Sequence, residues 1–326
     1  MKIGIPQGLL HWYYYPFWKV YFEQMGFEVI TSSSTTKEIV DQGVKHSVPE
    51  ICVPIKIFMG HVVNLLEQEV DYIFVPRFES IEKGKYFCPK FMGLPDLIRH
   101  YFDGVENKLV MPTIKTKTDN IANAKGFKEV AKQLGISRQV HNKALKKAEA
   151  SWLEFRSLCK KGFLATEAMD IIFGKKERVL KGQKNITLGV LGYVYNLYDP
   201  YVSMDILTKF REMGVNVKTF EMEEETLLNQ RISHMDKDLF WTFSNRLFSA
   251  GYRFYEHPEV DGIIHVTAFG CGPDAMLGKI LEYESEKYKK PFMTVRIDEH
   301  SGENHLQTRV EAFVDMIIRK KDKRGA

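Results

Sequence analysis

Apolar runs and amphipathic stretches alternate along the first third of the chain. Within residues 53–67, Ile57, His61 and Leu65 recur at helical spacing on one face. Short apolar segments, typical of strands buried in a parallel sheet, occur at residues 2–6, 27–31, 72–76 and 108–112. Strands that alternate with helices predict a doubly wound α/β layer.

The same alternation returns after a Lys-rich stretch whose pattern is only helical. Apolar segments follow at residues 186–192, 215–220, 262–269 and 291–298. The fold class is therefore α/β, with two Rossmann-like lobes that each contain a parallel sheet. We predict an N-terminal lobe over residues 1–118, a helical connector over 119–184 and a C-terminal lobe over 185–326.

An aromatic cluster at residues 11–15 precedes Pro16. Proline is well tolerated in the first turn of a helix, where its missing N–H would have no partner. We therefore expect a loop over residues 11–15 and a helix that begins at Pro16 and ends at Gly26.

Three of the four cysteines follow apolar runs at points where a new helix is expected. Cys52 lies in P-E-I-C-V-P-I-K, Cys88 in F-C-P-K-F-M-G and Cys271 in F-G-C-G-P-D-A-M, each with a proline one or two residues later. A thiol at a helix start faces the positive end of the helix dipole, which favours the metal-binding thiolate. Ligands of open α/β sheets collect beyond the carboxyl ends of the strands. Cys88 and Cys271 are both expected there, so a cleft between the lobes would bring these two thiols to one point.

The spacing of these cysteines does not by itself separate a metal site from three buried apolar residues, because no compact ligand motif is present. The fourth, Cys159, lies in the helical stretch F-R-S-L-C-K-K and is interpreted as a packing residue. Other candidate chemistry is the acidic segment D-E-H-S-G-E, where Glu299 and His300 are possible acid–base groups, and Glu50, two residues before Cys52. Lys56 and Lys90 follow Cys52 and Cys88 closely and would favour a reduced, anionic cluster.

Composition narrows the class of protein. The chain has 326 residues, a net charge of +4 and four cysteines without a repeated spacing, which argues against a secreted disulfide scaffold. It carries no nucleic-acid-binding motif, no Walker loop, no dinucleotide fingerprint and no apolar run long enough to span a membrane. We expect a cytoplasmic protein that binds neither nucleic acid nor membrane.

Several longer motifs resemble one protein family, the acyl-CoA dehydratase activase-related proteins. This domain of unknown function is associated with 2-hydroxyacyl-CoA dehydratase activases and is similar to 2-hydroxyglutaryl-CoA dehydratase subunits and to double-cubane cluster proteins. The motifs that carry the resemblance are I-G-I-P-Q-G-L-L, Y-Y-Y-P-F-W, P-E-I-C-V-P-I-K-I-F-M-G-H, C-P-K-F-M-G-L-P-D, Y-N-L-Y-D-P, F-G-C-G-P-D-A-M-L-G and I-D-E-H-S-G-E.

The resemblance implies an iron–sulfur cluster, of the 4Fe-4S type or related to a double cubane, held by Cys52, Cys88 and Cys271. It further implies a non-protein ligand on one iron, a separate ATP-dependent activase as electron donor, a small-molecule substrate and a homodimer. The expected protein is a component of an anaerobic metabolism that reduces or dehydrates its substrate at a cluster shielded by the aromatic segment at residues 11–15.

Three other functions remain open at this point. The first alternative is a true 2-hydroxyacyl-CoA dehydratase subunit. The second is a non-catalytic carrier or assembly protein for the cluster, and the third is a cluster-free Rossmann protein that binds a small molecule. The first requires binding of CoA thioesters, the second requires cluster transfer without turnover, and the third requires that the three thiols lie far apart.

Overall fold

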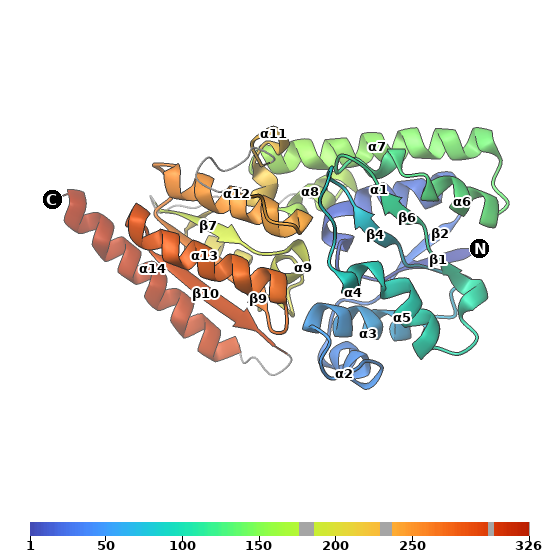
Figure 1. Cartoon of the computed structure of the whole chain (residues 1–326), viewed down its shortest axis with the longest axis horizontal. Coiled ribbons are helices and arrows are strands. Elements are labelled where there is room, and N and C mark those ends of the chain that lie inside the picture. Colours follow the sequence, from blue (N-terminus) through green and yellow to red (C-terminus); the bar gives the residue numbers. More distant parts are fainter. Residues whose placement is uncertain (176–185, 229–236, 299–302, 326) are drawn as a thin grey trace.

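Two four-stranded parallel sheets lie next to each other along the long axis of the molecule (Figure 1). The computed structural model describes residues 1–175, 186–228, 237–298 and 303–325. The strand order is β2-β1-β3-β5 in the first sheet and β10-β9-β7-β8 in the second. In both sheets the first strand lies between the second and the third, so the two lobes share one doubly wound topology and the predicted α/β, Rossmann-like fold is confirmed.

The first sheet contains the four predicted strands. They are β1 (Lys2–Ile5), β2 (Glu28–Thr31), β3 (Tyr72–Phe74) and β5 (Leu109–Val110). Two further strands, β4 (Arg77–Ser80) and β6 (Thr113–Lys115), pair in parallel as a separate two-stranded sheet. The sequence analysis missed them. They continue β3 and β5 beyond Pro76 and Pro112, where the missing proline N–H interrupts the ladder.

The helices of the first lobe pack around this sheet. They are α1 (His11–Gln24), α2 (Lys37–Lys45), α3 (Val53–Glu67), α4 (Pro89–Met92) and α5 (Leu94–Tyr101), with a 3₁₀ turn η1 (Glu106–Lys108). The prediction that a helix begins at Pro16 is wrong, because α1 begins at His11 and contains Pro16. Tyr13, Tyr14 and Phe17 are completely buried, so tertiary packing outweighs the backbone hydrogen bond that the proline cannot make.

The Lys-rich region is helical, as predicted. It forms η2 (Ile121–Asn123), α6 (Gly126–Gln133), α7 (Arg138–Lys160) and α8 (Ala165–Ile172). The long helix α7 runs across the first lobe (Figure 1) and packs along α1. There the indole N–H of Trp152 donates a hydrogen bond to the carbonyl of Tyr13 at 3.1 Å. This region therefore contributes to the core of the first lobe, and the domain limits at residues 118 and 184 stay a prediction.

The second sheet and its helices form the other lobe. The strands are β7 (Thr187–Leu191), β8 (Asn216–Thr219), β9 (Gly262–Ala268) and β10 (Phe292–Ile297). The helices are α9 (Val194–Leu197), α10 (Ile206–Glu212), η3 (Phe220–Met222), α11 (Glu225–Leu228), α12 (Thr242–Glu256), α13 (Gly272–Tyr288) and α14 (Glu303–Gly325). All seven residues of β9 are buried, and α12 and α13 cover one face of the sheet (Figure 1).

A buried ion pair joins the two lobes. Arg246 of α12 donates to the carboxylate of Asp119 at 3.0 Å, and Tyr13 of α1 donates to the same carboxylate at 2.6 Å. The Arg246 and Asp119 side chains are 1% and 3% exposed. Arg246 also reaches Glu225 at 3.3 Å. The pair fixes α12 against the first lobe, and the start of α12 borders the pocket described below.

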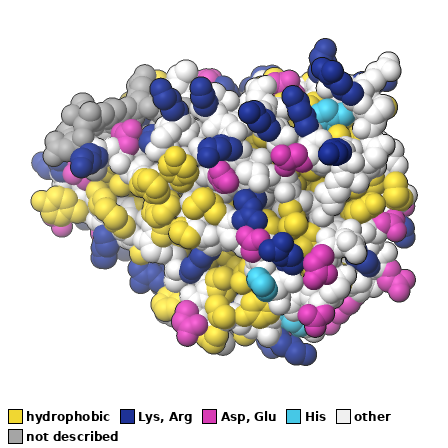
Figure 2. Space-filling model, turned by 45° about the vertical axis from the view of Figure 1, so that its right-hand side comes forward, with side chains coloured by type: hydrophobic (Ala, Val, Ile, Leu, Met, Phe, Trp, Pro, Cys, Tyr) yellow, Lys and Arg dark blue, Asp and Glu magenta, His cyan; other side chains and the backbone are white. Residues whose placement is uncertain are grey.

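The surface of the molecule mixes charges of both signs. On the face shown in Figure 2, Lys and Arg side chains are interspersed with Asp and Glu, and apolar side chains gather toward the left of the view. Phe269, Met276 and Tyr283 are among the exposed large apolar side chains. In the part of the chain that the structure describes, no helix has the length and apolar character needed to cross a membrane.

Candidate functional site

Three cysteines occupy the same local position, the residue that caps the N-terminus of a helix. Cys52 caps α3, Cys88 caps α4 and Cys271 caps α13, each with extended backbone. A proline follows in the first turn of each helix, at Pro54, Pro89 and Pro273. The prediction that these thiols lie at helix starts is therefore confirmed.

The fold brings the loops that carry Cys52 and Cys271 into contact. Cys271 follows β9, which neighbours β7 at the point where the strand order of the second sheet reverses. Gly270 has a left-handed φ of 78°, and a Cβ placed on it would lie 3.5 Å from the Cα of Cys52. A glycine at this position thus permits both the turn and the close approach of the two lobes.

Electrostatic coupling links all three thiols. Burial is the main cause that raises the pKa of Cys271, and Asp274 and the charges of Cys52 and Cys88 raise it further. Burial also raises the pKa of Cys52 and of Cys88, whereas Lys90 and backbone amides of the first helical turns act in the opposite direction. Burial raises the pKa of Tyr195, and the charges of Cys271, Tyr193, Cys88 and Cys52 raise it further. The Tyr195 ring lines the same pocket as Cys88 and Cys271.

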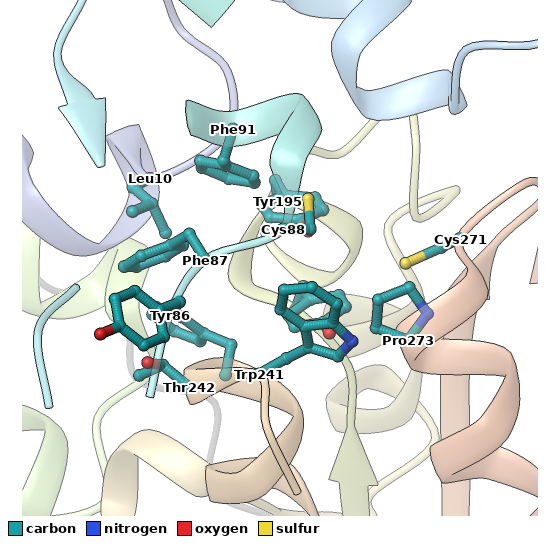
Figure 3. Close-up of a pocket in the computed structure, with 12 residues that line it drawn as sticks. Leu10, Tyr86, Phe87, Cys88, Phe91, Tyr195, Trp241, Thr242, Cys271 and Pro273 are labelled. Carbon is teal, nitrogen blue, oxygen red and sulfur yellow. The ribbon is translucent and has the colours of Figure 1, made fainter. Parts of the chain in front are cut away.

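Cys88 and Cys271 share a pocket with an aromatic wall (Figure 3). In the view of Figure 3, Cys271 lies on the right, Cys88 near the middle, and Leu10 and Tyr86 on the left. The aromatic lining consists of Tyr86, Phe87, Phe91, Tyr193, Tyr195, Trp241 and Phe243. The cavity encloses about 30 Å³, room for roughly one or two water molecules. Because Cys52 does not line it, the cavity is a small recess beside the thiols.

The aromatic residues 11–15, predicted to shield a cluster, do not line this pocket, although the neighbouring Leu10 does. Their rings pack in the core of the first lobe, where Tyr14 stacks on Phe78 and Trp152. The wall is closed instead by backbone pairing between lobes, in which the amide of Thr242 donates to the carbonyl of Tyr86 at 3.1 Å. Sequence reasoning missed this contact because it joins residues far apart in the chain.

The remaining candidates lie elsewhere or outside the described residues. Glu50 is exposed on the turn before Cys52, and its role as an acid–base group stays a prediction. Glu299 and His300 lie outside the described residues. Cys159 is completely buried in α7, and burial raises the pKa of its thiol to about 12, in accord with a packing role.

A buried histidine–aspartate pair supports the start of α13. His265 of β9 and Asp274 of α13 are both completely buried, and His265 Nε2 lies 2.9 Å from Asp274 Oδ1. Gly278 leaves room for this imidazole, since a Cβ there would lie 2.7 Å from His265 Nδ1. The sequence carried one signal for the pair, an apolar strand interrupted by a single histidine.

The thiols are not arranged as ligands of one metal ion. Within residues 1–175, 186–228, 237–298 and 303–325, no three His, Cys, Asp or Glu side chains form a group that could hold such an ion. An iron–sulfur cubane is a different case, because its thiolates bind separate iron atoms and do not converge on one point.

Comparison with known proteins places the chain in a family. No curated protein sequence gives a significant match. A family model described as a CoA enzyme activase uncharacterised domain (DUF2229) matches residues 2–222. This range includes the whole first lobe with Cys52 and Cys88, and ends before Cys271. Because the match covers more than half of the chain, the protein belongs to the CoA enzyme activase uncharacterised domain family.

Proposed function

We propose that this protein is an iron–sulfur protein that accepts low-potential electrons from an ATP-dependent activase and uses them to reduce or dehydrate a small substrate. Cys52, Cys88 and Cys271 would hold the cluster between the lobes. The observation that carries the proposal is that three cysteines, distant in sequence, cap three helices, that Cys88 and Cys271 line one pocket, and that the loop of Cys271 lies against Cys52.

The donor set fits an iron–sulfur cluster better than a single ion. Three thiols without a nearby histidine ligand are the donors that such clusters take, and a cluster with three protein thiolates keeps one iron for a non-protein ligand. When bound, the cluster would supply one-electron chemistry and a Lewis-acidic iron. The family description supports an activase as the partner, because the matched domain is named for CoA enzyme activases.

The protein's own residues would control access and charge. The aromatic wall excludes water from the side of Cys88 and Cys271, which strengthens electrostatic interactions there. The half-buried Lys90 lowers the pKa of both Cys52 and Cys88 and would stabilise the negative charge of a reduced cluster. The small recess favours a substrate of a few heavy atoms over an acyl-CoA thioester.

The test is anaerobic reconstitution with iron and sulfide, followed by metal analysis and EPR before and after reduction. We expect about four irons per chain and a signal that appears on reduction. The variants Cys52→Ala, Cys88→Ala and Cys271→Ala should each lose most of the iron. Cys159→Ala is the matched control, because it removes a buried thiol that lies in α7 and should leave the iron content unchanged.

The outcomes separate the alternatives. Unchanged iron in the Cys271→Ala variant would remove that residue from the ligand set, and no iron in the wild type would refute the cluster. Rapid transfer of the cluster to an acceptor protein without turnover would identify a carrier. Specific binding of acyl-CoA thioesters would identify a dehydratase subunit instead.

A further inference from the structure

A second, larger cavity lies between the lobes, away from the aromatic recess. It encloses about 360 Å³, a volume typical of small-molecule sites. Val53 and Ile57 of α3 form one wall together with Val40 of α2. The second lobe supplies residues 200–202, 204 and 205 and the end of β10, Ile297 and Asp298. The cavity therefore lies at the carboxyl end of a parallel strand, where ligands of this fold collect.

The described part of this lining is acidic. Its charged side chains are those of Asp205 and Asp298, and no Lys, Arg or His belongs to the described lining. The rest is mainly aliphatic, and Val40, Val53, Ile57, Val202 and Ile297 are at most 5% exposed. A carboxylate beside an aliphatic wall is suited to a cation with an apolar body and repels an anion.

Asp205 has an unusual conformation for its position. It caps the N-terminus of α10, where an aspartate normally accepts a hydrogen bond from the first turn, but it makes no such bond. Its φ is 53° and that of the preceding Met204 is also 53°. Non-glycine residues in this left-handed region are uncommon and concentrate at ligand sites. Within the described residues the Asp205 carboxylate has no hydrogen-bond or ion-pair partner.

The loop that carries Asp205 is fixed by hydrogen bonds across the lobes. One carboxylate oxygen of Asp199 accepts from the amides of Tyr201 at 3.0 Å and Val202 at 3.1 Å. The other accepts from the hydroxyl of Thr35 in the first lobe. Thr35 lies 3.0 Å from Nε2 of the buried His61, which belongs to α3. These hydrogen bonds hold the cavity wall in place.

We propose that this cavity binds a small aliphatic ammonium compound, with its apolar body against Val53 and Ile57 and its ammonium group at Asp205. The site needs neither iron nor an activase, so the proposal does not depend on the proposed function. An anion at the start of α3 is the competing ligand class, and the carboxylate of Asp205 disfavours it.

Isothermal titration of the full chain with three probes of equal length tests the proposal. The probes are pentylammonium, 1-pentanol and pentanoate, which have five carbons each and carry a cationic, a neutral and an anionic head group. We expect pentylammonium to bind at least tenfold more tightly than pentanol, and pentanoate to bind more weakly than either. The preference for pentylammonium should decrease as salt is added, because the attraction is electrostatic.

Asp205→Asn is the diagnostic variant. Asparagine tolerates the left-handed backbone, so the loop should retain its fold. This variant should bind pentylammonium no more tightly than pentanol, while its affinity for pentanol stays unchanged. Asp103→Asn, at an exposed aspartate outside the cavity, should behave like the wild type. Equal affinities for the three probes, tighter binding of pentanoate, no binding of pentylammonium, or an unchanged preference in Asp205→Asn would each overturn the proposal.

Discussion

Asp119→Asn should strongly destabilise the protein, because it leaves the charge of Arg246 buried without its partner. The Arg246 side chain is 1% exposed and lies 3.0 Å from Asp119. Removing one partner of a buried pair typically costs about 3–5 kcal/mol. Glu225 lies 3.3 Å from Arg246 and is 30% exposed, so it compensates part of the charge. We therefore expect a loss near 3 kcal/mol.

The assay is urea denaturation at pH 7, followed by circular dichroism. With an m-value of about 3 kcal/mol per M, a loss of about 3 kcal/mol lowers the midpoint by about 1 M. The double variant Asp119→Asn/Arg246→Met should lose less than the sum of the two single variants, by about 2 kcal/mol, because the two completely buried charges are removed together. Additive losses, or a loss below about 1 kcal/mol for Asp119→Asn, would refute the reasoning.

The same ion pair makes the stability of the protein depend on pH. Burial by itself raises the pKa of Asp119, but Arg246 and hydrogen-bond donors lower it to about 2. The unfolded value is about 3.9, so the folded state releases this proton more readily and the pair contributes about 2–3 kcal/mol above pH 4. This contribution should be lost as the pH falls from about 4 to about 2. Asp119→Asn should lack that part of the acid sensitivity.

Two further predictions concern the elements that position the candidate sites. Gly60→Ala should destabilise the protein by about 1–3 kcal/mol in thermal unfolding, because the new Cβ would lie 1.9 Å from the carbonyl oxygen of Ile39. Gly272→Ala is the control, because a Cβ there would meet no atom within 4 Å. Equal effects of the two substitutions would contradict this prediction. Burial raises the pKa of Asp199 to about 6, so the folded state releases this proton at a higher pH than the unfolded state does. The free energy of unfolding should therefore fall by about 2–3 kcal/mol as the pH rises from about 4 to 6. The urea midpoint of Asp199→Asn should not decrease over this pH range. A plot of midpoint against pH that runs parallel to that of the wild type would contradict the raised pKa of Asp199.

Local sequence patterns were sufficient for the elements and for the context of the cysteines. Continuous apolar runs predicted the eight strands of the two large sheets, and helical periodicity predicted α3 within its observed bounds. Proline in the first turn located the helix starts after Cys52, Cys88 and Cys271, because that preference depends only on neighbouring residues. The same rule failed at Pro16, where burial of Tyr13 and Tyr14 decided the helix start.

Only the tertiary structure decided which residues meet. The contact of Gly270 with Cys52, the pairing of Tyr86 with Thr242 and the ion pair of Asp119 with Arg246 each join positions more than a hundred residues apart. Such contacts depend on how the two sheets pack, and no periodicity within either segment records that packing. The chain by itself therefore determined two α/β lobes with three thiols at helix starts. The packing of the lobes placed Cys88 and Cys271 in one pocket, brought the loop of Cys271 against Cys52 and formed the separate carboxylate-lined cavity.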